Sequence, residues 1–511
     1  MKKFLVATIF LAFQIAFSQN NSAEIVVLNK DNAPTISKHI YGHFAEHLGR
    51  CIYDGIYVGD KSSIANANGV RNDIIKALQE LKVPNLRWPG GCFADTYHWK
   101  DGIGAKNERP SIVNRWWGGT TENNSFGTHE FLDLCEILGT EPYLAGNVGS
   151  GTPRELDEWV QYVNYKPGSP MADLRVKNGR KSPWNVTIWG VGNEMWGCGG
   201  NMTAEYYVNL YKHYATFMPS GDSKLFRIAS GANGDDYHWT EVLMRDVPKS
   251  LIEGVAMHWY TVIDWAKKGH STNFDESVYF ESMKQALRME ELVTKHSEIM
   301  DKYDPEKKVA LIVDEWGGWY EPDDTAKWGV LYQQNTIRDA MIAGVTLNIF
   351  NNHADRVRGA NLAQVVNVLQ SVILTDKEKM LLTPTYYVMK MYNVHQDAQL
   401  IPLKIESPKY ALDNKELPAV SVSASKDKNS LFHISLVNID SQKQNKVKIN
   451  VQQLDLKNIS GQILTSPKIT DYNSFENSDK IKPAVFKSFT IKNNQLEITL
   501  PPHCVVVLEG K

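Results

Sequence analysis

Two glutamates, Glu194 and Glu315, follow apolar segments at widely separated points of the chain. Glu194 ends the run Trp-Gly-Val-Gly-Asn-Glu, and Glu315 ends the run Leu-Ile-Val-Asp-Glu. Two carboxyl groups that flank one glycosidic bond can hydrolyse it, because one protonates the departing oxygen while the other attacks the anomeric carbon or activates a water. The acid of such a pair needs a raised pKa, which burial or a neighbouring carboxylate supplies. These residues therefore point to glycoside hydrolysis, provided that the fold brings them together.

The elements that must position them are short, mostly apolar segments rich in β-branched and aromatic residues. We identify eight, at residues 36–44, 83–89, 141–147, 185–193, 226–232, 254–260, 308–315 and 345–351. Helical patterns lie between them, for example at 72–81, 128–138, 204–217, 282–303 and 328–343. This alternation predicts an α/β fold, a closed (β/α)8 TIM barrel. An open doubly wound sheet is the alternative, but residues 190–195 lack the third glycine of its usual phosphate-binding motif.

The pattern changes after about residue 385. Segments 419–424, 431–437, 446–451 and 496–500 alternate apolar and polar residues, which predicts a C-terminal antiparallel β-sandwich. A lone strand at 24–28 is predicted to pair with it. We divide the chain into a signal peptide (1–18), an N-terminal strand packing on the sandwich (19–35), a catalytic barrel (36–385) and the β-sandwich (386–511).

Polar residues gather at the carboxyl ends of all eight predicted strands. They are His43, Glu46, Arg87, Gly90, Gly91, Cys92, Asn147, Asn193, Glu194, Asn233, His258, Tyr260, Asp314, Glu315, Asn351, Asn352 and His353. In a parallel barrel these ends share one rim, where active sites are built. Folding alone does not explain such a row, because buried polar groups need partners. The fourth and seventh strands carry the two glutamates and lie across the barrel mouth from each other, so the carboxyl groups can converge on one bond.

Other interpretations of these residues are possible. Both glutamates could be buried ion-pair partners, with Arg87 as a candidate cation. The segment His43-Phe-Ala-Glu46-His47 matches H-x-x-E-H, a zinc pattern that needs both histidines on one helical face. Here it follows a predicted strand and leads into a glycine-rich stretch, so we predict no metal and expect Glu46 to accept hydrogen bonds from sugar hydroxyls.

The N-terminus has the features of an export signal. Lys2 and Lys3 precede an apolar run at 4–13, and residues 16–18 (Ala-Phe-Ser) supply a small-x-small cleavage site. This predicts a secreted or periplasmic protein. The formal net charge of −3 shows no basic excess, which argues against nucleic-acid and anionic-membrane partners.

The cysteines leave the disulfide pairing open, whereas the distribution of tryptophan bears on the function of the C-terminal region. The five cysteines, at positions 51, 92, 135, 198 and 504, form no C-x-x-C, and their odd number leaves at least one thiol free, with the pairing open. All fourteen tryptophans lie between Trp88 and Trp328. Their absence from the C-terminal region argues against a tryptophan-lined sugar-binding module there.

Six blocks of sequence support a more specific hypothesis. They are YGHFAEHLGR (41–50), LRWPGGCFAD (86–95), YHWKDG (97–102), GNE (192–194), VDEW (313–316) and VLQ (368–370). In this order, over about residues 41–392, they resemble the α-L-arabinofuranosidases of glycoside hydrolase family 51. The C-terminal region is similar only in general character.

The resemblance implies a (β/α)8 barrel with a C-terminal β-sandwich and hydrolysis with retention of configuration, without a cofactor. It assigns the acid/base to Glu194 and the nucleophile to Glu315. Its sugar-contacting positions fall on Glu46, Cys92 (through its backbone), Asn193, Tyr260 and Gln370. Trp319 matches an aromatic that lines the family's site, and Trp117 (or its neighbour Trp116) a subsite wall. We also place His258 in the substrate site, next to Trp259, which stands where a smaller aromatic is expected.

We therefore predict an exo-acting retaining α-L-arabinofuranosidase that removes terminal non-reducing α-L-arabinofuranosyl residues from arabinan, arabinoxylan and oligosaccharides of the plant cell wall. A β-xylosidase or endo-glucanase on the same barrel is one alternative, and a carbohydrate-binding protein without catalysis is another. The presence of both glutamates with Asn193 and Gln370 argues against the latter. The resemblance also implies a homo-oligomer, commonly a hexamer.

Overall fold

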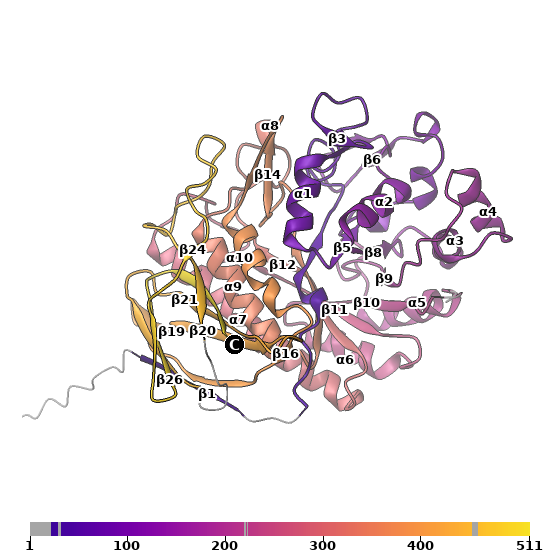
Figure 1. Cartoon of the computed structure of the whole chain (residues 1–511). Coiled ribbons are helices and arrows are strands. Elements are labelled where there is room, and N and C mark those ends of the chain that lie inside the picture. The colour runs from indigo at the N-terminus through magenta and orange to yellow at the C-terminus, as the bar shows by residue number, and fades with distance from the viewer. Residues whose placement is uncertain (1–21, 29–31, 219–220, 222, 452–457, 511) are drawn as a thin grey trace, which may run out of the picture.

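The computed structural model describes residues 22–28, 32–218, 221, 223–451 and 458–510. The predicted signal peptide, residues 1–18, lies outside these ranges. Within them, no helix is both long enough and apolar enough to cross a membrane. A parallel barrel and a β-sandwich lie side by side, with the sandwich at the lower left of Figure 1.

Eight parallel strands close into the barrel, and the last of them, β13, pairs with the first, β2. They are β2 (Gly42–Phe44), β5 (Asn85–Trp88), β8 (Glu141–Gly146), β9 (Ile188–Val191), β10 (Phe226–Asn233), β11 (Gly254–Thr261), β12 (Ala310–Gly318) and β13 (Val357–Ala363). The predicted closed barrel is confirmed, and the open sheet is excluded.

Helices cover the barrel and connect its strands. They are α1 (Asn72–Leu81), α2 (Thr128–Leu138), α3 (Pro153–Asn164), α4 (Pro170–Lys177), α5 (Ala204–Phe217), α6 (Tyr237–Asp246), α7 (Glu276–Tyr303), α8 (Thr325–Trp328), α9 (Ile337–Asn352) and α10 (Pro384–Tyr392). Several begin at a side chain that caps the helix: Thr152, Thr203 and Asp275 each accept a hydrogen bond from a backbone N–H of the first turn.

Short hairpins and 3-10 turns fill the connections. The hairpins are β3 (Asn66–Ala67) with β4 (Val70–Arg71), β6 (Ile112–Asn114) with β7 (Thr120–Glu122), β14 (Ile373–Asp376) with β15 (Lys379–Leu382), and β18 (Lys409–Leu412) with β19 (Lys415–Pro418). The 3-10 turns are η1 (Lys38–Tyr41), η2 (Ala94–Thr96), η3 (Trp99–Gly102), η4 (Lys106–Glu108) and η5 (Asn393–His395). The hairpin β6–β7 carries Trp116 and Trp117 in its turn.

The eighth strand lies later in the chain than predicted. Residues 345–351 belong to α9, and the barrel is completed by β13. The helix predicted at 328–343 is likewise displaced. Helix α9 begins at Ile337, directly after its N-cap residue Thr336, which forms a capping box with Asp339 in the first turn. All residues of α9 from Ile337 to Asn351 are buried. A helix that is buried on every side shows no amphipathic period, and it therefore resembles a buried strand in sequence.

This shift also moves three residues that were predicted at the rim. Asn351, Asn352 and His353 end or follow α9 instead of a strand. Asn351 accepts a hydrogen bond from the hydroxyl of Tyr41 at 2.7 Å and donates one to Ser423 at 3.1 Å. Asn351 and Asn352, which donates to the carbonyl of Val422 at 2.9 Å, therefore belong to the contact between barrel and sandwich, while His353 contacts Glu290 of α7 at 2.7 Å.

The sandwich consists of two sheets. One has the order β17 (Leu403–Glu406), β1 (Ser22–Val27), β22 (Asn445–Asn450), β26 (Gln495–Leu500) and β25 (Phe489–Lys492). The other has the order β16 (Gln399–Leu400), β20 (Val420–Lys426), β21 (Phe432–Asn438), β27 (Cys504–Gly510), β23 (Ser460–Leu464) and β24 (Ala484–Val485). The predicted N-terminal strand, β1, lies in the first sheet, antiparallel to β17 and parallel to β22.

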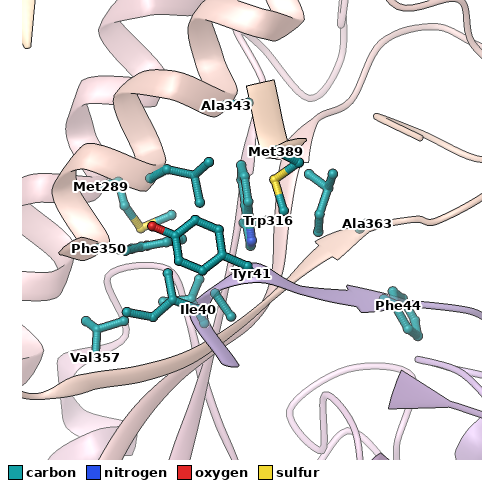
Figure 2. Close-up of a cluster of buried hydrophobic side chains, with 14 of the residues drawn as sticks. Ile40, Tyr41, Phe44, Met289, Trp316, Ala343, Phe350, Val357, Ala363 and Met389 are labelled. Atoms are coloured by element: carbon teal, nitrogen blue, oxygen red, sulfur yellow. The ribbon is translucent and has the colours of Figure 1, made fainter. Parts of the chain in front are cut away.

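Helix α9 separates the catalytic barrel from the sandwich and packs against both. On the barrel side, the ring of Trp316 from β12 meets that of Phe350 edge to face, with centroids 5.6 Å apart, near Tyr41 and Met389 (Figure 2). On the sandwich side, a Cβ at Gly344 would lie 2.8 Å from Val437, so only glycine allows this approach. Large buried aromatics contribute strongly to such packing. Helix α9 therefore packs against β12, the strand that carries Glu315.

Candidate active site

Both predicted catalytic glutamates lie at the same mouth of the barrel. Glu194 follows the end of β9, and Glu315 lies within the last part of β12. One carboxylate oxygen from each, together with a ring nitrogen of His258, lie within 4.8 Å of one another. Two carboxyl groups that are far apart in the sequence thus face one small space.

The turn that carries Glu194 is held by hydrogen bonds to its backbone. Glu194 has a φ of 45°, in the left-handed region that non-glycine residues seldom occupy. The carboxylate of Asp95 accepts the backbone N–H of the preceding residue, Asn193, at 2.8 Å. Its other oxygen accepts the N–H groups of Val148 and Gly149 at 2.7 and 2.8 Å. Asp95 therefore joins the loops that follow β8 and β9.

A disulfide bond lies beside the same turn. Cys92, after β5, is bonded to Cys198, and the sulfur of Cys198 lies 3.5 Å from Oε2 of Glu194. The sequence left the pairing open; the remaining cysteines, Cys51, Cys135 and Cys504, are free and buried. The predicted backbone contact of Cys92 with sugar is compatible with its place at the mouth and stays a prediction.

Glu315 is held by charged and polar side chains. Its Oε1 accepts a hydrogen bond from Nη1 of Arg87 at 2.9 Å, and its Oε2 accepts one from the hydroxyl of Tyr260 at 2.7 Å. The nearest nitrogen of His258 is 3.7 Å from Oε2. Arg87 is therefore an ion-pair partner of Glu315, and this pair lies inside the site.

These contacts determine the ionisation of the site. Burial alone would raise the pKa of Glu315, but the charges of His258 and Arg87 and the hydrogen bond from Tyr260 outweigh it, and the pKa is lowered. Burial disfavours the charged form of His258, yet Glu315 and the 2.9 Å hydrogen bond to Glu194 raise its pKa above the ordinary value. The surroundings therefore favour the ionised form of Glu315 and the protonated form of His258, whose ring lies between the two carboxyl groups.

The same three residues also have the types and spacing of metal ligands. One oxygen each of Glu194 and Glu315 and a ring nitrogen of His258 lie within 4.8 Å of one another, and Nδ1 of His258 is already engaged in the 2.9 Å hydrogen bond with Glu194. The sulfurs of Cys92 and Cys198, which also lie close to Glu194, are joined to each other.

Glu46 forms a second acidic position at the mouth. Its Oε1 accepts the backbone N–H of Phe93 at 3.0 Å and Nε1 of Trp117 at 2.9 Å. Its Oε2 accepts Nε2 of Gln364 at 3.0 Å. Burial, and then the charge of Glu315, raise the pKa of Glu46 to about 7. Trp117, the predicted subsite wall, therefore belongs to the same wall of the site as Glu46.

A row of aromatic rings begins beside Glu315. The ring of Trp319 stands edge to face with that of Tyr260, with centroids 5.0 Å apart, and with that of Trp265 at 5.5 Å. Trp265 is 59% exposed. These three rings extend from Glu315, which Tyr260 contacts, toward solvent, and flat ring faces of this kind suit the C–H surfaces of sugars.

Two predicted sugar contacts are also engaged by protein groups. Asn193 accepts a hydrogen bond from Nη2 of Arg87 through its side-chain oxygen at 2.6 Å. Gln370 is fully buried: its oxygen accepts the N–H of Gly318 at 2.6 Å, and its nitrogen donates to Asp339 and Thr385. Gln370 thus supports the backbone next to Glu315, and its contact with sugar stays a prediction.

Several residues that shape this site carried no signal of it in the sequence. Asp95, Gln364 and Cys198 were not predicted as site residues, and Arg87 was predicted at the rim and as a candidate ion-pair partner, but without a role in the reaction. Their contacts cross between different strands, and no local pattern reports such contacts. Asp95 lies within the block 86–95, but its sequence neighbours do not show which backbone groups it holds.

Comparisons with known proteins agree with this geometry. Residues 77–278 match the α-L-arabinofuranosidase 1 domain, and residues 314–504 the α-L-arabinofuranosidase C-terminal domain. An intracellular exo-α-L-arabinofuranosidase of Bacteroides ovatus is 51% identical, over 99% of each chain. The crystal structure of the GH51 arabinofuranosidase from Xanthomonas axonopodis pv. citri is 46% identical, with a TM-score of 0.94 over 96% of this chain and 100% of that one. The α-L-arabinofuranosidase of Thermotoga maritima in its arabinose complex is 33% identical, with a TM-score of 0.84 over 96% and 99%.

One prediction is wrong in the light of these comparisons. We predicted a secreted or periplasmic protein from the N-terminal pattern, but the similar Bacteroides ovatus protein, which aligns with 99% of this chain, is named as intracellular. A positively charged start followed by a short apolar run is a compositional signal. Composition over so few residues does not determine whether a segment directs export.

Proposed function

The chain belongs to the α-L-arabinofuranosidases of glycoside hydrolase family 51, and from this membership we propose how its residues share the reaction. The enzyme is an exo-acting retaining α-L-arabinofuranosidase, which releases terminal α-L-arabinofuranosyl residues. We assign the nucleophile to Glu315 and the acid/base to Glu194.

The distance between the two carboxyl groups carries this assignment. A retaining enzyme holds them about 5–5.5 Å apart, whereas an inverting enzyme needs about 6.5–9.5 Å to admit a water. Oxygens of Glu194 and Glu315 lie within 4.8 Å of each other. This separation is shorter than an inverting enzyme needs, and it supports direct attack by a carboxylate.

In the first step, Glu315 attacks the anomeric carbon. Its lowered pKa keeps it ionised. Glu194 donates its proton to the departing glycosidic oxygen as the bond breaks, and an ester between arabinose and Glu315 forms with inversion. Glu315 and Glu194 raise the pKa of His258, which favours its charged form. A charged ring 2.9 Å from Glu194 stabilises the anionic form of Glu194 that this proton transfer produces.

In the second step, Glu194 acts as a base. It takes a proton from a water that attacks the same carbon, and Glu315 departs as a carboxylate, so the second inversion restores the α configuration. The side chain of Glu194 is 17% exposed and that of Glu315 is 6% exposed. The greater exposure of Glu194 suits a group that exchanges protons with water.

The other predicted residues are proposed to bind the sugar. Glu46 accepts hydrogen bonds from hydroxyl groups, Asn193 donates to the hydroxyl next to the reacting carbon, and Tyr260 orients the nucleophile. The backbone of Cys92 and the amide of Gln370 complete the binding of the terminal residue. Trp117 and Trp319 line the approach of the rest of the substrate, and His258, which lies between the two glutamates, contacts the sugar beside the reacting bond.

The substrate class and the assembly are the finer parts of the proposal. The substrates are arabinose-containing glycans, and we propose arabinan, arabinoxylan and their oligosaccharides from plant cell walls. Family resemblance also supports a homo-oligomer, a hexamer. Light scattering coupled to size-exclusion chromatography tests the assembly, and product analysis on debranched and branched polymers tests the substrate.

NMR of the first-formed sugar tests the mechanism. With an aryl α-L-arabinofuranoside, we expect the α anomer of arabinose to form before mutarotation gives the equilibrium mixture. Immediate formation of the β anomer would contradict the assigned roles, because it requires a single displacement by water.

A further inference from the structure

Strand β12 contains one more residue than its neighbours at the position of the nucleophile. Between Ile312 and Glu315 it spans three steps, while its partner β11 spans two, from Ala256 to His258. On the other side, the step from Val313 to Trp316 is matched by Ala360 to Leu362 of β13. Such a bulge interrupts the alternation of side chains between the two faces of a strand.

Because of this bulge, two consecutive carboxylates point into the barrel. Asp314 and Glu315 are both buried, with 3% and 5% exposure. In a regular strand one of them would face the surrounding helices, as Trp316 does. Bulges next to active sites redirect side chains in this way. Asp314 is thus a second buried carboxylate directly beside Glu315.

Asp314 ends a chain of side-chain hydrogen bonds that crosses the inside of the barrel. Nδ2 of Asn85 donates to Oδ1 of Asn361 at 2.7 Å, and Nδ2 of Asn361 donates to Oδ1 of Asp314 at 2.9 Å. The hydroxyl of Tyr143 donates to the other oxygen of Asp314 at 2.7 Å. Burial raises the pKa of Asp314, while Arg87, His258 and the hydrogen bond from Tyr143 act in the opposite direction and favour its ionised form. Both oxygens accept hydrogen bonds, an arrangement that suits an ionised carboxylate.

The guanidinium of Arg87 lies between Asp314 and the reacting groups. Nη1 binds Glu315 and Nη2 binds Asn193, at 2.9 and 2.6 Å. Nε lies 4.0 Å from Oδ2 of Asp314, and among the described residues it has no hydrogen-bond partner. The ring of Phe44 lies under the guanidinium, 4.6 Å away. The two Nη atoms of Arg87 are therefore held by hydrogen bonds and its flat face by Phe44, while its Nε faces the carboxylate of Asp314.

We propose that Asp314 is a positioning residue of the reaction: it shares Arg87 with Glu315 and so holds the guanidinium between the nucleophile and Asn193. Asp314 contacts no substrate in this role. The bulge in β12 is the structural device that lets one arginine balance two adjacent carboxylates. The proposal rests on the assignment of Glu315 as the nucleophile.

The charges around Glu315 give the sign of the expected effect. Arg87 from β5 and His258 from β11 favour the negative charge of Glu315. The neighbouring acidic groups are Asp314, Glu194 and Glu46. Two hydroxyl groups, of Tyr143 and Tyr260, donate to Asp314 and Glu315. Asp314 competes with Glu315 for Arg87 and repels its negative charge. Without the charge of Asp314, the ionised form of Glu315 is favoured, so its pKa falls further.

Asp314→Asn tests this role, because it keeps the size of the side chain and removes its charge. We expect the acidic limb of kcat/KM on an aryl α-L-arabinofuranoside to move to lower pH by about half a unit or more. We also expect kcat to fall about tenfold, since the nucleophile becomes less basic and Arg87 less fixed, while KM changes little. An acidic limb that stays within about 0.2 units of the wild-type position would overturn the proposal.

Asp304→Asn is the matched control. Asp304 is also a buried carboxylate paired with a buried guanidinium, since Nη1 of Arg356 donates to it at 2.9 Å, but this pair precedes β12 and β13 and lies away from the mouth. The substitution should lower the melting temperature without moving the acidic limb. If both variants move the limb equally, the shift reports general destabilisation, and the proposal is wrong.

A second variant keeps the test decisive if Asp314→Asn does not fold. Tyr143→Phe removes one donor to Asp314 and leaves the carboxylate in place. Asp314 then becomes protonated more easily, and we expect a smaller shift of the limb in the same direction. A folded Tyr143→Phe enzyme with an unchanged limb counts against the proposal. Full activity of Glu315→Ala would instead contradict the nucleophile assignment, so the two failures are distinguishable.

Discussion

The two sides of the active site are built differently. Glu315 lies within a strand, and its oxygens are bound by Arg87 and Tyr260 at 2.9 and 2.7 Å. Glu194 lies in a turn after a strand, where its contacts are a ring nitrogen of His258 and the sulfur of Cys198. The proposed nucleophile, Glu315, is held through its side chain, whereas the proposed acid/base, Glu194, is held through the backbone of its turn.

This difference matches the two tasks. A nucleophile must be ionised and aimed at one carbon, so a rigid strand and fixed cations suit it. An acid/base must gain and lose a proton in every cycle, so strong fixed partners on its oxygens would oppose one of the two states. Asp95 and the Cys92–Cys198 bond fix the turn through its backbone, so the carboxyl group of Glu194 needs no fixed cation such as Arg87 to hold it in place.

Removal of the carboxylate of Glu315, the proposed nucleophile, should have the largest effect on activity. Glu315→Ala should reduce kcat by about 10⁴-fold or more, because no other carboxylate can reach the anomeric carbon from its position. Azide should enter the vacated space and form a β-arabinofuranosyl azide, with inversion, from an activated aryl substrate. Formation of the α azide would contradict the assignment of Glu315.

Removal of the acid/base should have a smaller effect that depends on the leaving group. Glu194→Ala should reduce kcat/KM by about 10²–10⁴-fold on arabino-oligosaccharides, whose alcohol leaving groups need a proton. With a 2,4-dinitrophenyl arabinofuranoside the first step should be nearly normal, and azide should give the α product, with retention. An equal loss on both substrates would argue that Glu194 does not donate the proton.

The backbone clamp can be loosened without touching either catalytic side chain. Asp95→Ala removes the acceptor of three backbone N–H groups in the loops after β8 and β9. We expect kcat to fall about 10–100-fold, because small displacements of a catalytic group are costly. The loss should be larger for poor leaving groups, since the displaced group is the acid. A loss that does not depend on the leaving group would place the effect of Asp95 on the nucleophile side.

The smallest effect on activity is expected from opening the disulfide. Cys92→Ser with Cys198→Ser should lower kcat less than tenfold but reduce the free energy of unfolding by about 2–4 kcal/mol. The bond closes a loop with a sequence separation of 106 residues, which restricts the unfolded chain. Cys135→Ala is the control, because Cys135 is buried and free. Equal melting temperatures for the double variant and the wild type would show that the bond contributes nothing to stability.

Much of the fold was predictable because the local pattern of apolar and polar residues indicates which face of a helix or strand is buried. Seven of the eight predicted barrel segments contain or overlap a true strand, and in the sandwich β20, β21, β22, β26 and the N-terminal β1 were predicted, whereas its other strands were not. The exception, residues 345–351, lies in α9, which is buried all round between barrel and sandwich. The true strand, β13, was missed because it carries Asn361 into the polar interior of the barrel and so lacks a continuous apolar run.

The sequence by itself determined the kinds of residue at each strand end, and with them the chemistry: Glu194 and Glu315 follow apolar segments whose closure into a barrel places them at one mouth. Only the tertiary structure decided which groups surround them. The extra residue in β12, the three N–H groups bound by Asp95 and the partner of Cys92 all depend on register between strands that are distant in the chain. Apolar patterning is a local property of the sequence, whereas the environment of a charge is the sum of contacts from every strand that reaches it.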